Sequence, residues 1–464
     1  MSQQIEQSLF IFRRDLRLAD NSALVNALAK SSQVLPCFIL DPRLLHSSKP
    51  HYNAIQFMVE ALEDLDHQLQ GHNSQLHFFY GMPQDILPRI LHSNPISGVF
   101  FNREYTPFSR RRDDNIRLIC NSAGVECQQF SDSLLNEPEM ILKTSQEPYK
   151  VFTPFFRKAS ELAITIPKVN PYSNFGKTKS KQQTTFTDVI KKIKVPHNEA
   201  ISIEGTRNAC QAILSNLRKY KTYVKIRDIP GIAGTTHLSA YIKFGICSIR
   251  EVYNAIEKQL GKGHPLIRQL YWRDFYTHIA YHFPHVFKKA FKPRYDAIQW
   301  NNDRILFEAW CQGRTGFPIV DAGMRELNTT GWMHNRVRMI VASFLTKDLH
   351  IDWRWGERYF AQQLIDYDPA VNNGNWQWAA STGVDAQPYF RIFNPWRQQE
   401  KYDPDCKYIR RWIPELTKLE SKIIHNWFKP TKWDSETNYP KPIVNHKLES
   451  QYSKEFFAAT FKNR

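Results

Sequence analysis

The segment LIDYDPAVNNGNWQWAASTG, at 364–383, packs aspartates, asparagines, tryptophans and small residues closely together. Its apolar residues follow neither the alternation of a β-strand nor the spacing near 3.6 of an amphipathic helix. Carboxylates, amides and indoles at this density are typical of a binding site. We therefore expect an irregular loop built around a functional site.

Two further segments predict helices with side chains that suit nucleic acid. In PLIRQLYWRDFYTHIAYHF the positions i, i+3, i+4 and i+7 share one face, which carries Gln269, Trp272, Arg273 and Tyr276. In GWMHNRVRMIVASFL a second face carries Trp332, Asn335, Arg336 and Met339. Rings stack on bases, amides bond base edges and cations hold phosphates, so two such faces favour a protein that receives an extruded base. For any single tryptophan, a ring that covers a neighbouring element is the plainer interpretation.

A third segment, GTTHLSAYIKFG at 234–245, places hydroxyl residues after a glycine at a predicted helix start. Free N–H groups and hydroxyls at such a position bind phosphate oxygens. A simple N-cap explains Thr235 or Thr236 equally well.

Composition narrows the class of protein. Lysine and arginine give a formal net charge of +17, which is typical of a polyanionic partner, although a merely basic enzyme is also consistent with it. The seven cysteines occur singly, so we expect no metal site and no disulfide framework, and a reducing cytoplasm fits. Neither a secretion signal nor an apolar run long enough for a membrane span is present, so we expect a soluble protein that is not exported.

The elements that must position these residues fall into two parts. Short apolar runs predict strands at 8–12, 33–40, 76–80, 98–101 and 125–130, and a helix is predicted at 53–69. This alternation predicts an α/β domain with a doubly wound parallel sheet over 1–135. A polar stretch within 136–205 predicts an interdomain connector, and 206–464 predicts an all-helical domain. No dinucleotide fingerprint follows the first strand, so an ordinary nicotinamide site is not expected.

These motifs carry a family resemblance. GTTHLSAYIKFG, YWRDFYTHI, LIDYDPAVNNGNWQWAASTG and the block 315–360 closely resemble the photolyase/cryptochrome family, in particular class I cyclobutane pyrimidine dimer photolyases. FRRDLRLADN at 12–21 resembles the N-terminal signature of the family. The resemblance spans essentially the whole chain. It implies an α/β domain that carries an antenna pigment and a helical domain that holds one FAD in a U-shaped form.

The resemblance also implies site residues by matching positions. The implied FAD contacts are Tyr223, Thr235, Thr236, His237, Leu238, Ser239, Arg338, Asp366, Tyr367, Asp368 and Asn372. Asn372 is implied to lie opposite the flavin N5, where a neutral amide accepts a hydrogen bond and favours reduced flavin. Arg338 is implied to pair with Asp366. Small residues at 379–381 are expected to let the backbone approach the ring.

Tryptophans are implied to serve two purposes. Trp300, Trp353 and Trp376 match the chain that passes electrons from the surface to the flavin, although each taken singly is simply a buried aromatic. Trp272 and Trp378 match the pair that wedges a flipped dimer, with Asn335 and Met339 beside it. Gln269 departs from the glutamate usual in class I enzymes, and glutamine at this position also occurs in cryptochromes and 6-4 enzymes.

The implied function is light-driven repair of cyclobutane pyrimidine dimers by electron transfer from excited, reduced FAD to a flipped-out dimer. The expected partner is UV-damaged DNA, duplex or single-stranded, and the protein is expected to be a monomer with no obligate protein partner. A cryptochrome-type blue-light receptor is the main alternative, and the end of the chain at Arg464 is expected to disfavour it. A 6-4 photoproduct photolyase and a simple flavin oxidoreductase are weaker alternatives.

A second chromophore is also expected. Folate-using relatives carry an Asn-Glu pair where this chain has Phe108 and Ser109. The NREYTPF form at 102–108 resembles relatives that use 8-hydroxy-5-deazaflavin or another flavin, which we favour over methenyltetrahydrofolate. Glu104 is the candidate contact.

Overall fold

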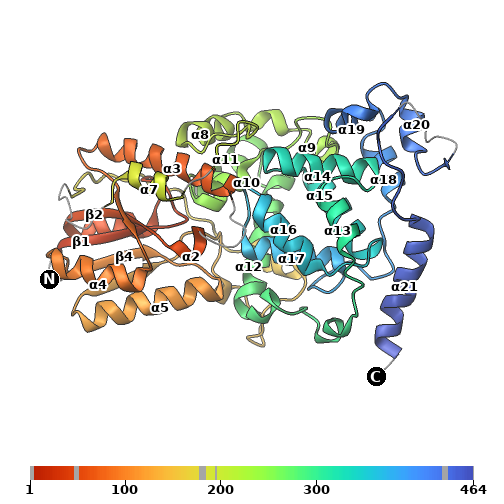
Figure 1. The fold of residues 1–464 in the computed structure, drawn as a ribbon. Helices are drawn as coiled ribbons and strands as arrows, with labels where there is room; N and C mark the ends of the chain where they lie inside the picture. Colours follow the sequence, from red (N-terminus) through yellow and green to blue (C-terminus); the bar gives the residue numbers. More distant parts are fainter. Residues whose placement is uncertain (1–4, 46–51, 177–183, 194–195, 431–436, 463–464) are drawn as a thin grey trace.

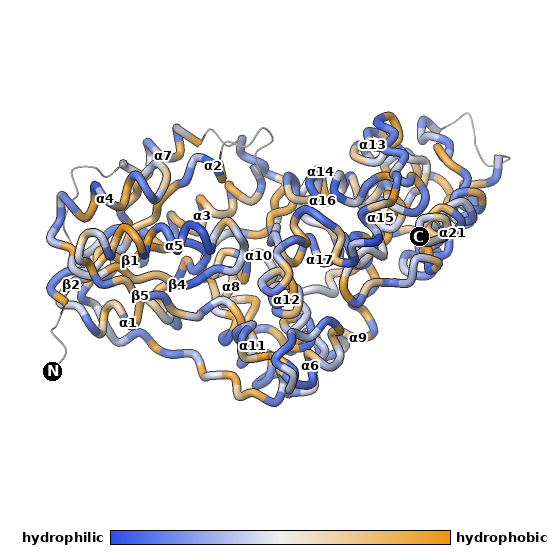
Figure 2. The backbone as a smooth tube through the Cα atoms, turned by 90° about the horizontal axis from the view of Figure 1, so that it is seen from below, coloured by the Kyte–Doolittle hydropathy of each residue, from blue (hydrophilic) through white to orange (hydrophobic). Residues whose placement is uncertain are grey.

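The structure is a computed structural model of the chain and describes residues 5–45, 52–176, 184–193, 196–430 and 437–462. Figure 1 shows an α/β part at the N-terminal end beside a larger helical part, with the two termini at opposite ends of the long axis. Figure 2, seen from below, shows the same division, with hydrophobic residues gathered along the strands. None of the described helices combines the length and the apolar character that a bilayer crossing needs.

The α/β part is built on a parallel sheet in the order β3-β2-β1-β4-β5. Its strands are β1 Ile5–Phe12, β2 Ser31–Leu40, β3 His77–Tyr80, β4 Gly98–Asn102 and β5 Glu126–Phe130. Because the strand order reverses beside β1, the carboxyl ends of β1 and β4 flank a switch point, where open α/β sheets usually bind ligands. The predicted strands and doubly wound fold are confirmed.

Helices cover both faces of this sheet. Alternate strand residues such as Phe10 and Leu9 point to opposite sides and join different hydrophobic clusters. The cluster on one side includes α1 Ser22–Lys30 and α3 Tyr52–Gln70, and the other includes α4 Pro83–Ser93 and α5 Pro107–Ser122. The short α2 spans Pro42–Leu45. Burial on both faces explains why the strands appear in the sequence as nearly continuous apolar runs.

The range predicted as a connector contains elements of its own. They are η1 Pro138–Met140, α6 Phe152–Ser160 and α7 Phe186–Ile193, where η denotes a 3-10 helix. Phe175 bridges to Val34 of β2 and Thr184 bridges to Phe78 of β3, so parts of this range run along the sheet. The helix α6 instead packs on the helical part, against α12 Pro265–His282.

The helical part extends from residue 207 to the end of the described chain. Its first half comprises α8 Arg207–Ser215, η2 Leu217–Tyr220, α9 Tyr223–Ile226, α10 Leu238–Phe244, α11 Ile249–Leu260, α12, η3 Pro284–Phe287 and η4 Pro293–Ala297. The second half comprises α13 Arg304–Cys311, α14 Pro318–Thr330, α15 Asn335–Lys347, α16 Trp353–Gln363, α17 Pro369–Ala380, α18 Pro395–Tyr402, α19 Lys407–Trp412, η5 Pro414–Leu416, α20 Ser421–His425 and α21 His446–Lys462. The helices α10 to α12 share a hydrophobic cluster with one face of the sheet, whereas α13 to α19 contribute to a separate one.

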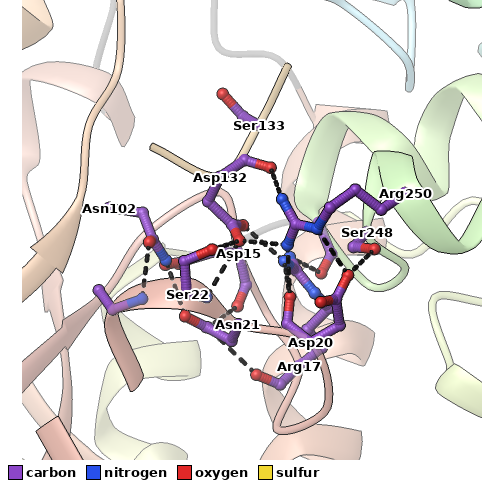
Figure 3. Close-up of polar contacts among 12 residues, drawn as sticks. Asp15, Arg17, Asp20, Asn21, Ser22, Asn102, Asp132, Ser133, Ser248 and Arg250 are labelled. Carbon is purple, nitrogen blue, oxygen red and sulfur yellow. Dashed lines mark hydrogen bonds and ion pairs between the residues drawn. The ribbon is translucent and has the colours of Figure 1, made fainter. Parts of the chain in front are cut away.

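A buried polar network joins the two parts (Figure 3). Arg250 of α11 donates from Nε to Asp20 Oδ2 at 2.9 Å and from Nη2 to Asp132 Oδ1 at 2.7 Å. Arg17 donates to the other oxygen of Asp132 at 2.5 Å, and Ser248 donates to Asp20 at 2.5 Å. Opposite charges therefore compensate each other inside the boundary between the α/β and helical parts.

Candidate active site

A cavity of about 480 Å³ opens within the helical part. Its lining comes from α9 to α12 and from α15 to α17, so segments more than a hundred residues apart in the sequence meet at one cavity. A space of this size, lined by apolar residues with a few polar groups, is typical of a small-molecule site.

Most of the predicted site residues line this cavity. All the implied FAD contacts do so, namely Tyr223, Thr235, Thr236, His237, Leu238, Ser239, Arg338, Asp366, Tyr367, Asp368 and Asn372. From the predicted DNA and dimer set, Gln269, Trp272, Arg273, Tyr276, Asn335, Met339 and Trp378 do so as well. Trp376 also lines the wall. Arg336, Trp353 and Trp300 lie outside it.

The segment 364–383 is not the irregular loop that we predicted. Most of it forms α17, which Asp368 caps by accepting hydrogen bonds from the N–H groups of Ala370 and Val371, with Pro369 at the first helical position. One side of the helix lines the cavity, and the other packs against protein. Asn373 and Gln377 bury their amides against the carbonyl of Val286 at 2.9 and 3.0 Å. Polar residues therefore replace the apolar stripe by which an amphipathic helix is recognised.

The implied pair of Arg338 and Asp366 is present. Two guanidinium nitrogens of Arg338 donate to the two carboxylate oxygens of Asp366, each at 3.1 Å. Ser239 Oγ of α10 donates to Asp366 at 2.7 Å. This bidentate contact compensates the carboxylate at the cavity wall and fixes the segment before α17 against α15.

The amide of Asn372 has a defined orientation. Its Nδ2 donates to the backbone carbonyl of Glu357 on α16 at 3.1 Å. In the described part of the chain the amide oxygen accepts no hydrogen bond, and Asn372 lines the cavity. This oxygen is thus the acceptor that remains for a ligand donor.

The start of α10 has an unusual backbone. His237 adopts a left-handed conformation with φ of 55° immediately before the helix, and its ring stacks on Trp332 with centroids 4.1 Å apart. Thr236 Oγ1 accepts from the N–H of Leu238 at 3.4 Å, and Tyr220 donates to the carbonyl of Thr235 at 3.0 Å. The hydroxyl run predicted at a helix start therefore does lie at one, on the cavity wall.

Two arginines differ from the expectation that they hold phosphates. Arg336 donates to Asp228 at 2.9 Å and lies over the ring of Tyr402. It does not line the cavity as Asn335 and Met339 do, and its contact with DNA stays a prediction. Arg273 lines the cavity, but its Nη1 donates to the carbonyl of Ser133 at 2.7 Å.

The three predicted electron-transfer tryptophans lie at different depths. Trp376 is 2% exposed and packs directly on the backbone of α16 at Gly356. The contact is so close that a Cβ at Gly356 would lie only 2.1 Å from the ring. Trp353 is buried at the start of α16. Trp300 is half-buried and contacts the rings of Phe456 and Phe457 on α21.

Sequence reasoning missed a contact that the α/β part makes with this site. Arg14, just after β1, forms an ion pair with Asp368 and donates from Nε to the carbonyl of Lys243 at 3.0 Å. Burial alone would raise the pKa of Asp368, but Arg14, with the other nearby cations, outweighs it and holds that pKa well below its usual range. A contact over this sequence separation leaves no local pattern, so only the fold discloses it.

A small polar cavity of about 30 Å³ lies where the two parts meet. Glu104 and Lys243 line it together with Arg13 and Arg14. Glu104 Oε2 accepts from Arg112 at 2.8 Å and from Ser109 at 2.9 Å, whereas its buried Oε1 has no hydrogen-bond partner in the described part of the chain. Burial, reinforced by Arg14, lowers the pKa of Lys243 to about 7.

Comparison with known proteins follows the same two-part division. Residues 8–172 match the DNA photolyase family, and residues 266–459 match the FAD binding domain of DNA photolyase. A deoxyribodipyrimidine photo-lyase of Synechococcus sp. is 37% identical over 472 residues, which cover 97% of this chain and 96% of that protein. The chain belongs to the DNA photolyase family.

Solved structures of the photolyase family extend the comparison. A photolyase from Sulfolobus tokodaii, solved with two FAD molecules, is 40% identical with a TM-score of 0.87 and covers 98% of this chain and 100% of that one. A class III photolyase from Agrobacterium tumefaciens is 33% identical, with a TM-score of 0.90 and coverage of 100% and 99%. A cryptochrome from Synechocystis sp. is 28% identical, with a TM-score of 0.88 and coverage of 98% and 100%. The predicted combination of an α/β domain and an all-helical FAD-binding domain is confirmed.

Proposed function

We propose that this protein is a deoxyribodipyrimidine photo-lyase that uses light to repair cyclobutane pyrimidine dimers in DNA. One observation carries the proposal: a single cavity combines the implied flavin contacts with the residues implied to receive a dimer. Relatives that share more than a third of their residues with this chain, over nearly its full length, bear the same enzymatic name. When bound, reduced FAD supplies an electron to the dimer on illumination and regains it after the ring has split.

The protein residues hold and orient the flavin. Arg338 and Ser239 fix Asp366, which is placed to accept hydrogen bonds from ligand hydroxyls. The amide oxygen of Asn372 would be available to accept a hydrogen bond from a bound flavin, because its nitrogen already donates to the carbonyl of Glu357. Such an acceptor favours a reduced flavin, whose N5 carries a proton, over an oxidised flavin, whose N5 offers only a lone pair.

The other part of the cavity receives the dimer. Trp272 of α12 and Trp378 of α17 both line the cavity with flat apolar rings, and both are half-buried. Gln269 of α12 lines the same cavity without a side-chain hydrogen bond in the described part of the chain, so it is free to donate to a thymine carbonyl. Asn335 and Met339 of α15 also line this cavity. Excluding water from it protects the separated charges from wasteful reactions.

We infer that Trp376, Trp353 and Trp300 supply electrons that keep the flavin reduced. Trp300 is half-buried, Trp353 and Trp376 are both buried, and of the three only Trp376 lines the cavity. Each step would oxidise one indole and reduce the next one inwards, and a thiol in solution would refill the outermost indole.

We propose an antenna chromophore of the 8-hydroxy-5-deazaflavin or flavin type. The unpaired oxygen of Glu104 and the amine of Lys243 line the small polar cavity at the domain boundary, close to the switch point of the sheet. The Sulfolobus tokodaii photolyase was solved with two FAD molecules, which supports a flavin as the second pigment. Acid extraction of the native protein followed by chromatography tests this, and methenyltetrahydrofolate in the extract would contradict it.

We further propose that the enzyme acts as a cytoplasmic monomer on duplex or single-stranded damaged DNA, without an obligate protein partner. None of the seven cysteines, all of which lie in the described part of the chain, forms a disulfide, which supports a reducing compartment. Light scattering at several protein concentrations tests the monomer, and a mass that grows with concentration would contradict it.

Two alternatives remain distinguishable by experiment. A cryptochrome would bind FAD without repairing DNA, and the solved Synechocystis cryptochrome is less similar in sequence, at 28% identity, than the photolyases compared. A 6-4 photolyase is favoured only by Gln269, and the segment GWMHNRVRM carries asparagine and methionine where that class has a pair of histidines.

The deciding experiment is illumination of the reduced protein with an oligothymidylate that carries one cyclobutane dimer. Chromatography of the oligonucleotide measures how much dimer remains. We expect the dimer to disappear only in the light and only with FAD bound. The same protein should leave a 6-4 photoproduct unchanged. Repair of the 6-4 lesion, or repair of neither lesion by fully reduced protein, would overturn the proposal.

A further inference from the structure

The indole of Trp272 has another ring packed flat against one of its faces. Phe152 of α6 lies with its centroid 3.6 Å from that of Trp272, at an interplanar angle of 7°. Phe152 is 1% exposed, whereas Trp272 is half-buried and lines the cavity. Protein therefore covers one face of the indole and leaves the other for a ligand.

Further rings restrict the same indole. Phe275 meets it edge-on at 5.8 Å and Tyr276 lies at 5.7 Å, tilted by 34°. The guanidinium of Arg268 lies 5.0 Å from the centre of Phe152, outside the pair. Because other rings contact one face and the edges of the Trp272 indole, its side chain has little rotational freedom. It therefore loses little conformational entropy when a ligand stacks on its open face.

A carboxylate from a distant segment fixes Phe152. The backbone N–H of Phe152, the first residue of α6, donates to Asp385 Oδ2 at 3.0 Å. Val151, the residue that precedes the helix, provides no side-chain cap, so Asp385 satisfies one of the unpaired N–H groups of the first turn. The segment that follows α17 thereby holds α6 against α12.

Trp378, on α17, is supported differently. It makes no ring contact in the described part of the chain and packs on the second hydrophobic cluster, whereas Trp272 belongs to the first. The two implied stacking surfaces are thus unequal, one backed by a parallel ring and one not.

We propose that Phe152 is a positioning residue that holds Trp272 as a rigid stacking wall for the dimer, and that Asp385 keeps Phe152 in place. The inference rests on the proposed function, because it assigns the open face of Trp272 to the lesion. A wall that is already ordered gives up less conformational entropy on binding. Phe152 therefore strengthens the affinity for a flipped-out pyrimidine dimer without touching the substrate.

The chain provides a matched control for the test. Phe156, one turn further along α6, stacks on Phe152 at 5.8 Å and also lies beneath Arg268, but its other ring partner is Tyr271 and not Trp272. Phe152→Leu removes the flat support while keeping apolar volume, and Phe156→Leu makes the same change one ring further away. Phe152→Tyr restores a flat ring.

Affinity is measured for an oligothymidylate with one cyclobutane dimer and for the same oligothymidylate without it. We expect Phe152→Leu to weaken binding of the dimer oligonucleotide by about 2- to 10-fold, with little change for the undamaged one. Phe152→Tyr should restore the preference, and Phe156→Leu should retain it. Asp385→Ala should cause a smaller loss of affinity, again selective for the dimer oligonucleotide. Because Asp385 is exposed, this variant tests the same support without the risk that a substitution in the core, such as Phe152→Leu, misfolds the protein.

Three readouts separate this role from a merely structural one. FAD content, photoreduction of the flavin, and the repair rate of the saturated complex should remain those of the unchanged protein in Phe152→Leu. Equal losses on both oligonucleotides, or an equal effect of Phe156→Leu, would overturn the inference. If the unchanged protein itself shows no preference for dimer DNA, the proposed function fails first, and the two failures are thereby distinguished.

Discussion

Gln269 is the residue whose chemistry bears most directly on substrate choice. It lies on α12 at the cavity wall, half-buried and without an internal side-chain partner in the described part of the chain. An amide keeps the reach of a carboxylate but fixes its charge at zero, so it donates to a carbonyl and repels a negatively charged dimer less. It offers no proton to share with the reduced lesion.

The first prediction therefore concerns Gln269→Glu. We expect a higher yield of repaired dimer per absorbed photon, because the carboxyl is able to share a proton with the reduced dimer. Affinity for dimer DNA should stay within about tenfold of that of the unchanged protein, because the substitution alters no more than one hydrogen bond to the dimer. Quantum-yield measurement on dimer oligonucleotide tests this, and a yield equal to or below the original would contradict it.

A second prediction at this scale concerns Trp376→Phe. Phenylalanine is much harder to oxidise than tryptophan, so light should no longer reduce the oxidised flavin at the original rate. Protein that has been reduced chemically should repair dimers almost as before. We expect a cost in unfolding free energy of about 1–3 kcal/mol, because the smaller ring leaves space beside α16. Transient absorption measures the first effect, and unchanged photoreduction would remove Trp376 from the path.

Single residues were predictable from sequence where a long motif carried them. The positions from Tyr223 to Trp378 matched a family pattern, and nearly all of them meet at one cavity. Arg336 shows the limit, because helical spacing alone placed it beside Asn335 although it pairs with Asp228. Phe152 and Arg14 were not found at all, since each acts through a tertiary contact that no local spacing encodes.

Helix α17 shows why element prediction succeeds in some places and fails in others. The strands of the sheet were found because burial on both faces requires continuous apolar runs. In α17 the inward positions are amides that bond backbone carbonyls of η3, so the pattern of hydrophobic residues gave no helical signal. The cap at Asp368 and the proline after it were the signs that could have indicated a helix start.

A titratable contact between α16 and α17 provides the element-scale prediction. Glu357 Oε1 accepts from Asn373 Nδ2 at 2.9 Å, and burial raises the pKa of Glu357 to about 7. The unfolded chain loses this proton at lower pH than the folded chain does. Stability contributed by the protonated group is therefore complete below the ordinary glutamate pKa and is lost as pH rises through about 7.

Glu357→Gln should remove that dependence. Between about pH 5 and pH 8 we expect the variant to gain up to about 3 kcal/mol of unfolding free energy relative to the unchanged protein. Urea unfolding at several pH values, with matched FAD content, measures the difference. A difference that stays constant over this range would contradict the assignment.

At the scale of the whole molecule, buried charges hold the α/β and helical parts together. Asp132 accepts from Arg17, Arg250 and Ser22, and it is 3% exposed. Arg17 and Arg250 outweigh the effect of burial and lower the pKa of Asp132, so its contribution to stability is present at neutral pH and is lost as pH falls through the folded value.

Asp132→Asn should destabilise the boundary because it leaves buried guanidinium charge uncompensated. We expect a loss of about 3–5 kcal/mol in unfolding free energy, with the α/β and helical parts unfolding in two separate thermal transitions. Calorimetry tests this. Asp114→Asn, in the exposed pair with Arg117, is the control and should cost less than about 1 kcal/mol. Equal effects of the two variants would refute a special role for the network.

The ion pair between Arg14 and Asp368 has a consequence for the order in which the protein is made. The two residues are 354 positions apart, so at roughly 5–20 residues per second Asp368 leaves the ribosome tens of seconds after Arg14. The sheet closes its own contacts within the first 130 residues and has time to fold beforehand. The cavity wall gains its last charged residue only well after the sheet has been synthesised, so we expect cofactor loading to follow the folding of the α/β part.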